Sequence, residues 1–211
     1  MDERSLAVTA VRSVGPDAVA IDIETPEDFA AQPGQFVKLT LEVDGAEESR
    51  FYTISSPNVD GTFEMTVGID PDGDVAPHLA DLEAGDTVRI SGPFGSDYYE
   101  GEGRSILLAG GPGIGPAIGI AERALADGNE AAVVYRDDAP IHEDRLDALR
   151  ETGAIVHVLD GDADLTEAVA DAAADGGQVF VYGFADFLDS AMAALEAAGV
   201  DTEDAKVENF G

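Results

Sequence analysis

A chain of 211 residues is long enough to fold as one large domain or as two small ones with a buried core. Its formal net charge of −33, from 44 acidic residues against 11 Lys and Arg, disfavours nucleic-acid binding, because phosphate neutralisation needs clustered cations. The chain has no cysteine, which excludes disulfides, thiolate metal sites and cysteine-ligated iron–sulfur clusters.

Charge and hydropathy also indicate the cellular environment of the protein. The sequence has no long apolar run and no basic-then-apolar leader, so we expect neither a membrane span nor a secretory signal. Because 45% of the residues are hydrophobic and follow regular patterns, the charge does not indicate disorder. Salt mutes self-repulsion by shortening the Debye length from about 8 Å at 0.15 M to about 3 Å at 1 M. The composition therefore predicts a soluble, cytoplasmic protein of a salt-accumulating halophile.

The part of the chain before about residue 100 shows the period-2 alternation of half-buried strands. Apolar residues alternate with polar or small ones over 19–23, 37–43, 63–69 and 88–90. Turn-forming pairs separate these runs: Pro33-Gly34, Asp44-Gly45, Asp60-Gly61, Asp72-Gly73 and Gly85-Asp86. Short strands with regular turns predict a small six-stranded antiparallel β-barrel, with one helical turn over 77–82.

In the rest of the chain, strands and helices alternate. Apolar runs predict strands over 105–109, 131–135, 154–158 and 178–182, and a final short strand that begins at Val207. Amphipathic segments predict helices over 116–127, 141–151, 164–174 and 186–198. This alternation predicts a Rossmann-like, doubly wound parallel sheet. The glycine- and acid-rich connector over 95–103 separates the two units, and we place the domains at 1–98 and 99–211.

The stretch from Ile106 to Leu125 joins a buried strand to a helix through a glycine-rich turn. Glycines occupy positions 110, 111, 113 and 115, and Pro116 suits a first helical turn, where its missing N–H is not needed. This arrangement lets backbone N–H groups approach a phosphate closely. The G-x-G-x-x-G fingerprint would need another glycine at position 116, so an ordinary tight turn is the alternative interpretation.

The segment RFYTISSP, residues 50–57, carries an arginine in a chain that has few cations. Arg50 either forms a surface ion pair with Glu47 or Glu48, worth about 0–1 kcal/mol, or binds a phosphate with its guanidinium fork. In the second case Tyr52 presents an aromatic face to a flat ring. Two further segments have unusual residues for a turn and a tail: SGPFGS at 91–96 and ENFG at 208–211.

Together these segments resemble the ferredoxin–NADP reductase family of flavoproteins. The shared motifs follow the same order through nearly the whole chain: PGQF at 33–36, R-x-Y-T at 50–53, GPFG at 92–95, AGGPGIGP at 109–116 and E-x-F near the end. The resemblance implies an FAD-binding barrel followed by a nicotinamide-nucleotide-binding domain. It also implies that hydride passes between the two rings where the domains meet.

The resemblance implies roles for individual residues. Arg50 would neutralise the flavin pyrophosphate, Tyr52 would lie against the isoalloxazine, and Thr53 would hydrogen-bond near flavin N5. Glu208 and Phe210 would form the family's terminal pair near the reacting rings, so the implied catalytic residues are Tyr52, Thr53, Glu208 and Phe210. The implied cofactor-binding residues are Arg50, Phe51, Tyr52, Thr53, Gly73, Val75, Ala76, Gly110, Gly111, Pro112, Gly113, Ile114, Arg136, Tyr182 and Gly183.

The sequence departs from the family pattern in three segments. Ala76 lacks the hydroxyl that often contacts the flavin phosphate, so backbone N–H groups near Leu79 would serve instead. In the glycine turn, Pro112 and Gly115 replace two threonines. Tyr182 occupies the place of the family's cysteine, so its bulkier ring would have to seat the nicotinamide.

The choice between NADH and NADPH stays open. Arg136 follows the second predicted strand of the α/β unit and could meet a 2′-phosphate. Asp137 and Asp138 come directly after it and would repel that phosphate, which favours NADH. The three histidines lie far apart without acidic partners at ligand spacing, so no metal site is expected.

The sequence thus predicts an NAD(P)H-dependent FAD oxidoreductase that transfers hydride to flavin N5. Electrons would pass to an external acceptor: a ferredoxin, a free flavin, oxygen or a partner subunit. FMN is the less favoured flavin. The alternative is a flavin-binding electron-transfer subunit or regulatory module without NAD(P)H turnover of its own. A fold that has lost its cofactor is a third possibility, against which the retained Arg50-x-Tyr52-Thr53 motif counts.

Overall fold

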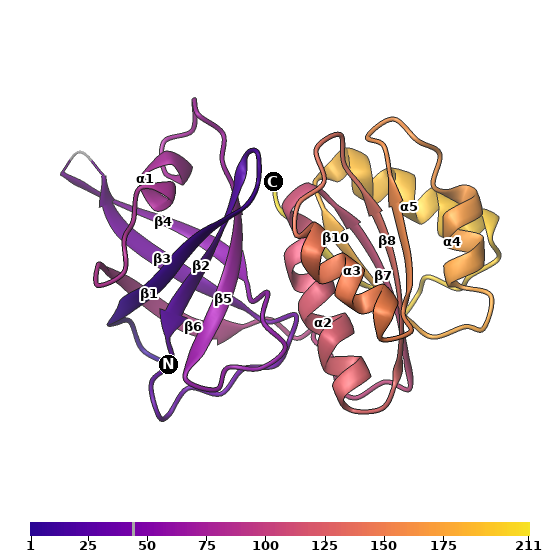
Figure 1. Ribbon diagram of the computed structural model, residues 1–211, viewed down its shortest axis with the longest axis horizontal. Helices are drawn as coiled ribbons and strands as arrows, with labels where there is room; N and C mark the ends of the chain where they lie inside the picture. The colour runs from indigo at the N-terminus through magenta and orange to yellow at the C-terminus, as the bar shows by residue number, and fades with distance from the viewer. Residues whose placement is uncertain (44) are drawn as a thin grey trace.

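The structure is a computed structural model that describes residues 1–43 and 45–211. Asp44, half of the predicted Asp44-Gly45 turn, lies outside the described residues. The first half of the chain forms an antiparallel sheet, which lies beside a parallel sheet with helices on both faces (Figure 1). The C-terminus lies at the junction of these two units (Figure 1).

The first unit consists of strands and one short helix: β1 (Arg4–Gly15), β2 (Ala18–Glu24), β3 (Phe36–Val43), β4 (Ala46–Thr53), β5 (Thr62–Gly68), α1 (Ala76–Ala80) and β6 (Thr87–Phe94). The strands pair in the order β4-β3-β6-β1-β2-β5, always antiparallel, which confirms the predicted six-stranded sheet. Ile54, just after β4, forms one bridge with Met65 of β5. Among the described residues this bridge links the two ends of the strand order, so the unit is barrel-like and not a fully closed barrel.

Alternate side chains of these strands point into one apolar core, as the sequence pattern predicts. Ile21, Leu39, Phe63 and Ile90 come from four different strands and are each fully buried in it. The short helix α1 adds Leu79, also fully buried, to the same cluster. The core therefore holds the sheet and α1 as one unit.

Two of the six strands were not among the runs that alternation picks out. In β1 the pairing with β2 shifts register between Val8 and Ala10 and again between Ser13 and Gly15, which breaks the period of 2. β4 is an edge strand with mostly polar or exposed residues, so it has no apolar alternation to detect. β4 nevertheless carries the Arg50–Thr53 motif.

The second unit consists of β7 (Arg104–Gly110), η1 (Gly111–Gly113), α2 (Ile114–Ala126), β8 (Glu130–Arg136), α3 (Glu143–Glu151), β9 (Ile155–Leu159), α4 (Thr166–Ala172), β10 (Gln178–Gly183), α5 (Ala185–Ala197) and β11 (Lys206–Asn209). Its strands are all parallel in the order β11-β10-β7-β8-β9, which confirms the predicted doubly wound sheet. Helix α2 begins two residues earlier than the sequence suggests, because the 3-10 turn η1 leads directly into it.

Helices α2 and α3 cover the sheet face nearer the first unit, and α4 and α5 cover the other face (Figure 1). Strand β7 is buried on both faces: Leu107 packs toward α2, and Ile106 and Leu108 pack toward α4 and α5. A run of apolar residues without alternation is what a central parallel strand requires. This explains why the sequence stretch around β7 reads as continuously apolar.

The strand order reverses between β7 and β10. From β7 the chain proceeds to β8 and β9 on one side, then crosses to β10 and β11 on the other. In doubly wound sheets, ligands bind in the crevice outside the carboxyl ends of the strands at such a switch point. Here the segments at that point are the glycine turn η1, which follows β7, and Phe184, which follows β10.

The connector between the units runs from Gly95 to Gly103, between β6 and β7. It is fastened to both units, because Tyr99 donates its N–H to Pro33 O at 2.9 Å and Lys206 donates to Tyr98 O at 2.5 Å. The predicted boundary between residues 98 and 99 falls within this connector and stays a prediction. In the described ranges 1–43 and 45–211, none of the helices has the length and apolar character that a membrane span requires.

Candidate functional site

A cavity of about 650 Å³ lies where the two units meet. It is lined on one side by β4 and β5, and on the other by the glycine turn, Phe184 and the C-terminal segment. Among the predicted site residues it brings together Arg50, Phe51, Tyr52, Thr53, Pro112, Glu208 and Phe210. Segments far apart in the sequence thus converge on one hollow.

Arg50 contacts the cavity with its side chain 45% exposed. Its Nη1 donates to Glu48 Oε2 at 3.2 Å and to Ser49 O at 2.9 Å, so the expected surface pairing with Glu48 is present. A guanidinium has five N–H donors, and a half-exposed ion pair of this kind contributes little stability. Arg50 therefore has donors available for an anion in the cavity.

Tyr52 and Phe51 alternate along β4 and line different parts of the cavity wall. Tyr52 packs against the core of the first unit, and burial raises the pKa of its hydroxyl to about 12, while Arg50 acts in the opposite direction. The tyrosine is therefore neutral and presents an aromatic ring. Phe51 is 63% exposed, and its ring meets Phe36 edge-on at 5.6 Å between centroids. Both aromatic faces suit a flat ligand.

Thr53 and Glu208 form a hydrogen-bonded pair across the two units. Thr53 Oγ1 lies 3.0 Å from each of the two carboxylate oxygens of Glu208 and donates to them. Burial raises the pKa of Glu208 to about 7; the bond from Thr53 opposes this rise and the charge of Asp97 adds to it. A carboxyl group with this pKa can both hold and release a proton near neutral pH.

Two aromatic residues stand beside this pair. Phe210 lies 6.3 Å from Phe184 in an edge-on arrangement and 6.5 Å from Tyr182, measured between ring centroids. The N–H of Phe210 donates to Gly183 O at 3.0 Å, which ties the C-terminal segment to the end of β10. Phe184 is 51% exposed and, like Phe210, lines the cavity.

The glycines of the turn are required by close packing. A Cβ on Gly110 would lie 2.5 Å from Phe187 Cγ, and one on Gly113 would collide with the backbone of Tyr182. Gly111 has φ of +56°, the left-handed region that favours glycine. The N–H of Ile114 already donates to carbonyls within η1, and Pro112 has no N–H. Of the predicted residues of this turn, Pro112 lines the cavity, whereas Gly110, Gly111, Gly113 and Ile114 are not among its described lining residues.

Tyr182 does not line the cavity. Its ring is buried in the core between the sheet and α2, and its hydroxyl is directed at the first unit, 3.0 Å from where a Cβ on Gly34 would stand. Within the described residues this hydroxyl has no hydrogen-bond partner. Gly183 lies behind Phe184, and a Cβ there would lie 2.8 Å from Phe187 Cδ1. The ring of Tyr182 therefore belongs to the core of the second unit, and Phe184 lines the cavity in its place.

At the end of β8, Arg136 and Asp137 point in different directions. The Arg136 guanidinium lies 5.2 Å from the centre of the Phe187 ring on α5 and within 3.5 Å of Ser190 Oγ. Asp137 accepts a hydrogen bond from the Tyr135 hydroxyl at 3.0 Å and is the nearest side chain to the Cβ position of Gly111. The acidic residue, and not the basic one, faces the glycine turn.

The segment predicted to contact a flavin phosphate lies outside the cavity lining. Gly73 donates its N–H to Asp70 O at 3.0 Å, and Asp70 is at the cavity edge, so Gly73, Val75 and Ala76 follow just beyond it. The N–H of Leu79 is engaged within α1, where it donates to Val75 O. The suggested contact of neighbouring N–H groups with a flavin phosphate stays a prediction.

Sequence reasoning missed part of the cavity wall. The end of β5 contributes Gly68, Ile69 and Asp70, and a Cβ on Gly68 would lie 3.5 Å from Pro112 Cγ, in ordinary contact. The strand run ending at 69 was recognised, but nothing in its alternation indicates a ligand. Phe184 could have been found, since it directly follows the Tyr182-Gly183 pair singled out by the motif.

A strand carrying arginine, tyrosine and threonine thus shares one cavity with a glycine turn at a switch point, the place where doubly wound sheets bind their ligands. Residues 5–99 match the family model described as oxidoreductase FAD-binding domain. The electron transfer component of toluate 1,2-dioxygenase from Pseudomonas putida is 30% identical over 151 residues, 67% of this chain and 44% of that protein. The glycine betaine monooxygenase reductase subunit from Chromohalobacter salexigens is 39% identical over 103 residues, 46% of this chain and 27% of that protein.

Solved structures agree in fold over the whole chain. A ferredoxin NADP+ reductase from Neisseria gonorrhoeae, solved with FAD and NADP, superposes with a TM-score of 0.84 at 18% identity and covers 100% of both chains. The FAD/NAD-binding domain of nitric oxide dioxygenase from Vibrio cholerae gives 0.83 at 20% identity, again covering 100% of both chains. The chain belongs to the ferredoxin–NADP reductase family of FAD-dependent oxidoreductases. The matched segment spans less than half of each of the two curated relatives named above.

Proposed function

We propose that the chain is an NAD(P)H-dependent FAD oxidoreductase, with a flavin-binding domain at 1–98 and a nicotinamide-dinucleotide-binding domain at 99–211. Hydride passes from C4 of the nicotinamide to N5 of the flavin, and electrons then pass to an external acceptor. The observation that carries the proposal is the cavity in which Tyr52 and Thr53 face Pro112 and Glu208. Two planar rings must stack closely with water excluded, which suits a site between two domains.

The residues on the β4 side are suited to FAD. A cavity of about 650 Å³ lies within the size range of cofactor sites. Arg50 has guanidinium donors for a pyrophosphate, and Tyr52 offers a neutral aromatic ring for the isoalloxazine. Phe51 is exposed for the rest of the dinucleotide, which favours FAD over FMN. Gly73, Val75 and Ala76 would contact it only from beyond the cavity edge.

The opposite wall is suited to a nicotinamide dinucleotide. In this proposal the N–H groups of Gly111 and Gly113 bind its phosphates, with Gly110, Pro112 and Ile114 shaping the turn. Tyr182 and Gly183 act from behind by holding Phe184 and Phe210 in place. Because Asp137 faces Gly111 while Arg136 is stacked on Phe187, the site favours NADH over NADPH.

In this proposal Thr53 and Glu208 serve proton transfer to and from the flavin. When bound, the flavin supplies the two-electron acceptor and the store from which electrons leave. Thr53 already donates to Glu208, so its oxygen would be able to accept a hydrogen bond from a bound flavin. Thr53 and ionised Glu208 would then form a path by which a proton released at flavin N5 could reach water. Phe210 shields this exchange from bulk solvent.

The acceptor is a separate molecule in this proposal: a ferredoxin, a free flavin or a redox partner subunit. Support comes from the relatives, since one is the electron transfer component of a dioxygenase and another is the reductase subunit of a monooxygenase. With a net charge of −33, the chain repels an acidic partner at low salt and attracts a cationic one. Molar salt weakens both effects.

A flavin-binding electron-transfer subunit or regulatory module without NAD(P)H turnover of its own is the second candidate. One observation favours it: the C-terminal Phe210 and the bulky Tyr182 pack together at the nicotinamide side of the cavity. Purification in high salt, followed by anaerobic addition of NADH or NADPH, separates the two functions. A yellow protein that is bleached is the oxidoreductase; a yellow protein that stays coloured is the subunit or module; a colourless protein contradicts both.

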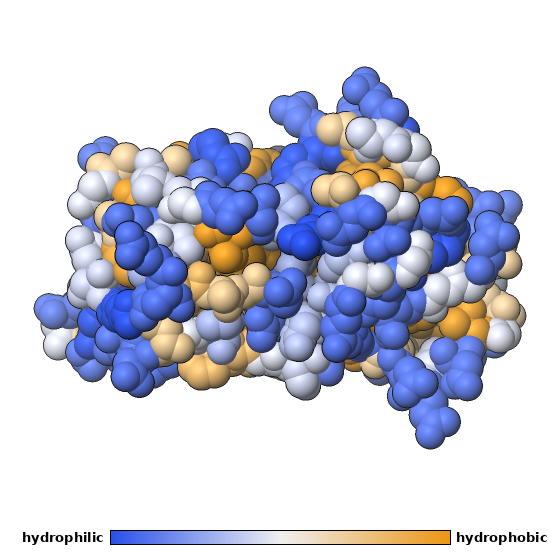
Figure 2. Space-filling model, turned by 90° about the horizontal axis from the view of Figure 1, so that it is seen from below, coloured by the Kyte–Doolittle hydropathy of each residue, from blue (hydrophilic) through white to orange (hydrophobic). Residues whose placement is uncertain are grey.

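We further propose that the chain works in a high-salt cytoplasm, as a halophile's protein does. The support is its charge of −33 and the face drawn in Figure 2, on which hydrophilic residues predominate and hydrophobic ones form separate patches. Self-repulsion on this scale is muted when the Debye length falls to about 3 Å. Unfolding measured against salt concentration tests this proposal.

A further inference from the structure

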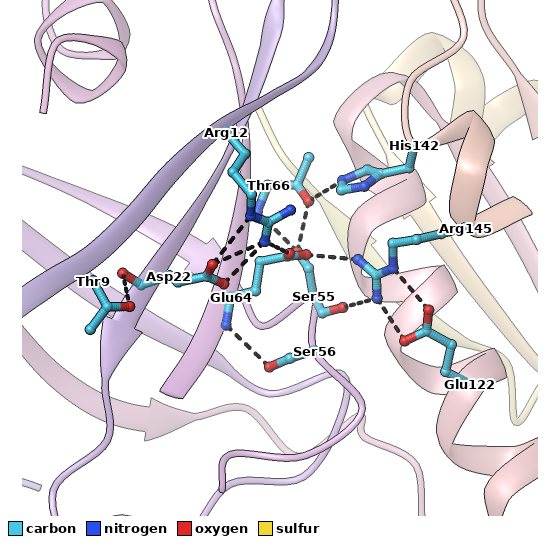
Figure 3. A network of polar contacts seen from close by, with 10 residues as sticks. All are labelled: Thr9, Arg12, Asp22, Ser55, Ser56, Glu64, Thr66, Glu122, His142 and Arg145. Carbon is cyan, nitrogen blue, oxygen red and sulfur yellow. Dashed lines mark hydrogen bonds and ion pairs between the residues drawn. The ribbon is translucent and has the colours of Figure 1, made fainter. Parts of the chain in front are cut away.

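A network of charged and polar side chains joins the two units beside the cavity, which it reaches through Thr66. Figure 3 shows its centre, where Arg145 of α3 reaches from the second unit to Glu64 and Ser55 of the first. Glu64 is buried with a side chain only 9% exposed, and the Arg145 side chain is 22% exposed. An ion pair this well shielded from water depends on its geometry far more than a surface pair does.

Arg145 uses four of the five N–H donors of its guanidinium. It donates to both carboxylate oxygens of Glu122 at 2.8 Å, to Glu64 Oε1 at 2.7 Å and to Ser55 O at 2.8 Å. Glu122 belongs to α2, in the same unit, so this bidentate pair fixes the orientation of the guanidinium. The other two bonds cross to the first unit. Arg12 adds a second cation on Glu64, at 2.7 Å.

The backbone segment that Arg145 holds is also the surface on which α2 rests. A Cβ on Gly119 would lie 2.7 Å from Ser55 O, and one on Gly115 would lie 2.6 Å from Ser55 Oγ. The missing side chains of these two glycines therefore let the helix touch Ser55 directly. Ser55 Oγ in turn lies 2.9 Å from Thr66 Oγ1, which contacts His142 Nε2 at 2.8 Å.

The contact between Ser55 and α2 lies next to the proposed flavin site on one side and the glycine turn on the other. Thr53 of the proposed flavin site is two residues before Ser55, and the glycine turn η1 directly precedes α2. A shift of Ser55 relative to α2 would therefore change the separation between Thr53 and the turn. Displacement of about 1 Å between reacting groups is enough to slow a transfer reaction by about 100-fold.

We propose that Arg145 is a positioning residue for hydride transfer: by holding Ser55 and Glu64 against α2, it sets the spacing between the two ring-binding sites. The inference rests on the proposed function for the reaction it serves. The spacing between the two units can be measured without turnover, so this part of the inference does not depend on the proposed function. Arg145 touches neither ring site, since among the described residues it does not line the cavity.

The main test variant is Arg145→Met, which keeps an unbranched apolar stem and removes the guanidinium and its donors. Arg150→Met is the matched control, because Arg150 lies on the same helix and pairs with Asp147 at the surface. We expect anaerobic flavin reduction by NADH to slow at least 10-fold in Arg145→Met, with weaker nicotinamide–flavin charge-transfer absorbance. Flavin content and the concentration of NADH needed for half-maximal rate should change less than 3-fold. The control should match the wild type.

The spacing is measured independently with spin labels. The chain has no cysteine, so Asp81→Cys in the first unit and Glu167→Cys in the second give a unique labelled pair. Arg145→Met should broaden the distance distribution of this pair, whereas Arg150→Met should not. Unchanged distances and an unchanged reduction rate overturn the proposal. If the wild-type protein is not reduced by NADH or NADPH, the proposed function fails. The distance distribution then still shows whether Arg145 sets the spacing between the two units.

Arg145→Lys covers the case in which the methionine variant does not fold. A single ammonium group can bond Glu64 or Ser55 but cannot hold Glu122 in two places at the same time. Its reduction rate and distance distribution should lie between those of the wild type and Arg145→Met. A lysine variant with wild-type rate and a wild-type distance distribution would show that no guanidinium geometry is needed, and would overturn the proposal.

Discussion

Thr53 donates a hydrogen bond to both carboxylate oxygens of Glu208 at 3.0 Å, although 155 positions separate the two residues in the chain. One residue ends β4 of the first unit, and the other lies on β11, at the edge of the parallel sheet. Both line the cavity between the units. The bond therefore places Glu208, a carboxyl group whose pKa is raised to about 7, at the contact between the two units.

Replacing Glu208 by glutamine should slow electron transfer from the reduced flavin to ferricyanide by about 100-fold, since positioned acid–base groups contribute that much or more. In the wild type this rate should fall as the pH falls through about 7, where Glu208 takes up a proton and stops accepting the one from N5. Stopped-flow reoxidation across the pH range measures both effects. Glu203→Gln, at an exposed position in the loop before β11, is the control. A wild-type profile without this pH dependence contradicts the role of Glu208.

The pH dependence of folding should reflect His142, which sits between the two units. Burial, then the charges of Arg145 and Arg12, lower the pKa of His142 from 6.5 to about 3. The unfolded chain therefore binds a proton below pH 6.5 that the folded chain refuses, so this contribution to stability is present above 6.5 and is lost as the pH falls toward 3. The free energy of unfolding should drop by up to about 1.4 kcal/mol per pH unit from this group.

His142→Asn is the variant that tests this loss. His142 has φ of +57°, a conformation that asparagine tolerates better than most residues, so the backbone is kept. Urea unfolding at pH 7 and pH 5 should show a smaller drop for the asparagine variant than for the wild type. Equal drops in the two proteins would mean that His142 titrates normally.

Removal of Arg50 should release flavin. Arg50→Ala deletes a guanidinium whose charge-assisted hydrogen bonds are worth about 1.5–3 kcal/mol, which corresponds to about a 10- to 150-fold rise in the dissociation constant for FAD. Arg89→Ala serves as the control, because Arg89 pairs with Glu3 and Glu47 on the same sheet and does not line the cavity. Titration of apoprotein with FAD, followed by fluorescence, measures the constants. Equal affinity in the two variants would remove Arg50 from the flavin site.

Features with a local signature, such as hydrophobic periodicity or a motif, can be predicted from the sequence. Features that arise only from tertiary contacts cannot. The parallel strands and the Arg50–Thr53 motif have signatures of periodicity or residue order. Arg145 has no such signature, because it lies on a helix rich in charged residues, and such a helix is normally interpreted as exposed to solvent. Its partner Glu64 is on β5 and Ser55 follows β4, both far from Arg145 in the chain, so their convergence depends on how the two units pack.

The glycines show the same limit in another form. Gly115 was recognised as part of a turn suited to phosphate, but its close neighbours are the hydroxyls of Ser55 and Thr66. A glycine that admits a ligand and a glycine that admits a neighbouring backbone look the same in a sequence. Only the position of the first unit against α2 distinguishes the two uses.

Gly119→Ala should therefore destabilise the contact between the units. Its Cβ would lie 2.7 Å from the carbonyl oxygen of Ser55, a backbone atom that cannot move aside easily. Overpacking of this kind costs about 1–3 kcal/mol, despite the better helix propensity of alanine. Gly103→Ala is the control, because a Cβ there meets nothing within 4 Å. Urea unfolding should separate the two variants, and equal stability would mean that α2 can shift without cost.

Salt should stabilise the fold by screening and not through the network around Arg145. The formal charge of −33 is spread over a hydrophilic surface, where ions reach it, whereas Glu64 and Arg145 are shielded from them. The urea midpoint should thus rise steeply between about 0.15 M and about 1 M KCl and level off once the Debye length reaches about 3 Å. Sodium and potassium chloride should act alike at equal ionic strength, and an excluded non-electrolyte such as sucrose should not reproduce the steep early rise. A urea midpoint that is independent of salt contradicts adaptation to concentrated salt. If sucrose produces the same rise, the cause is the exclusion of solute from the protein surface and not charge screening.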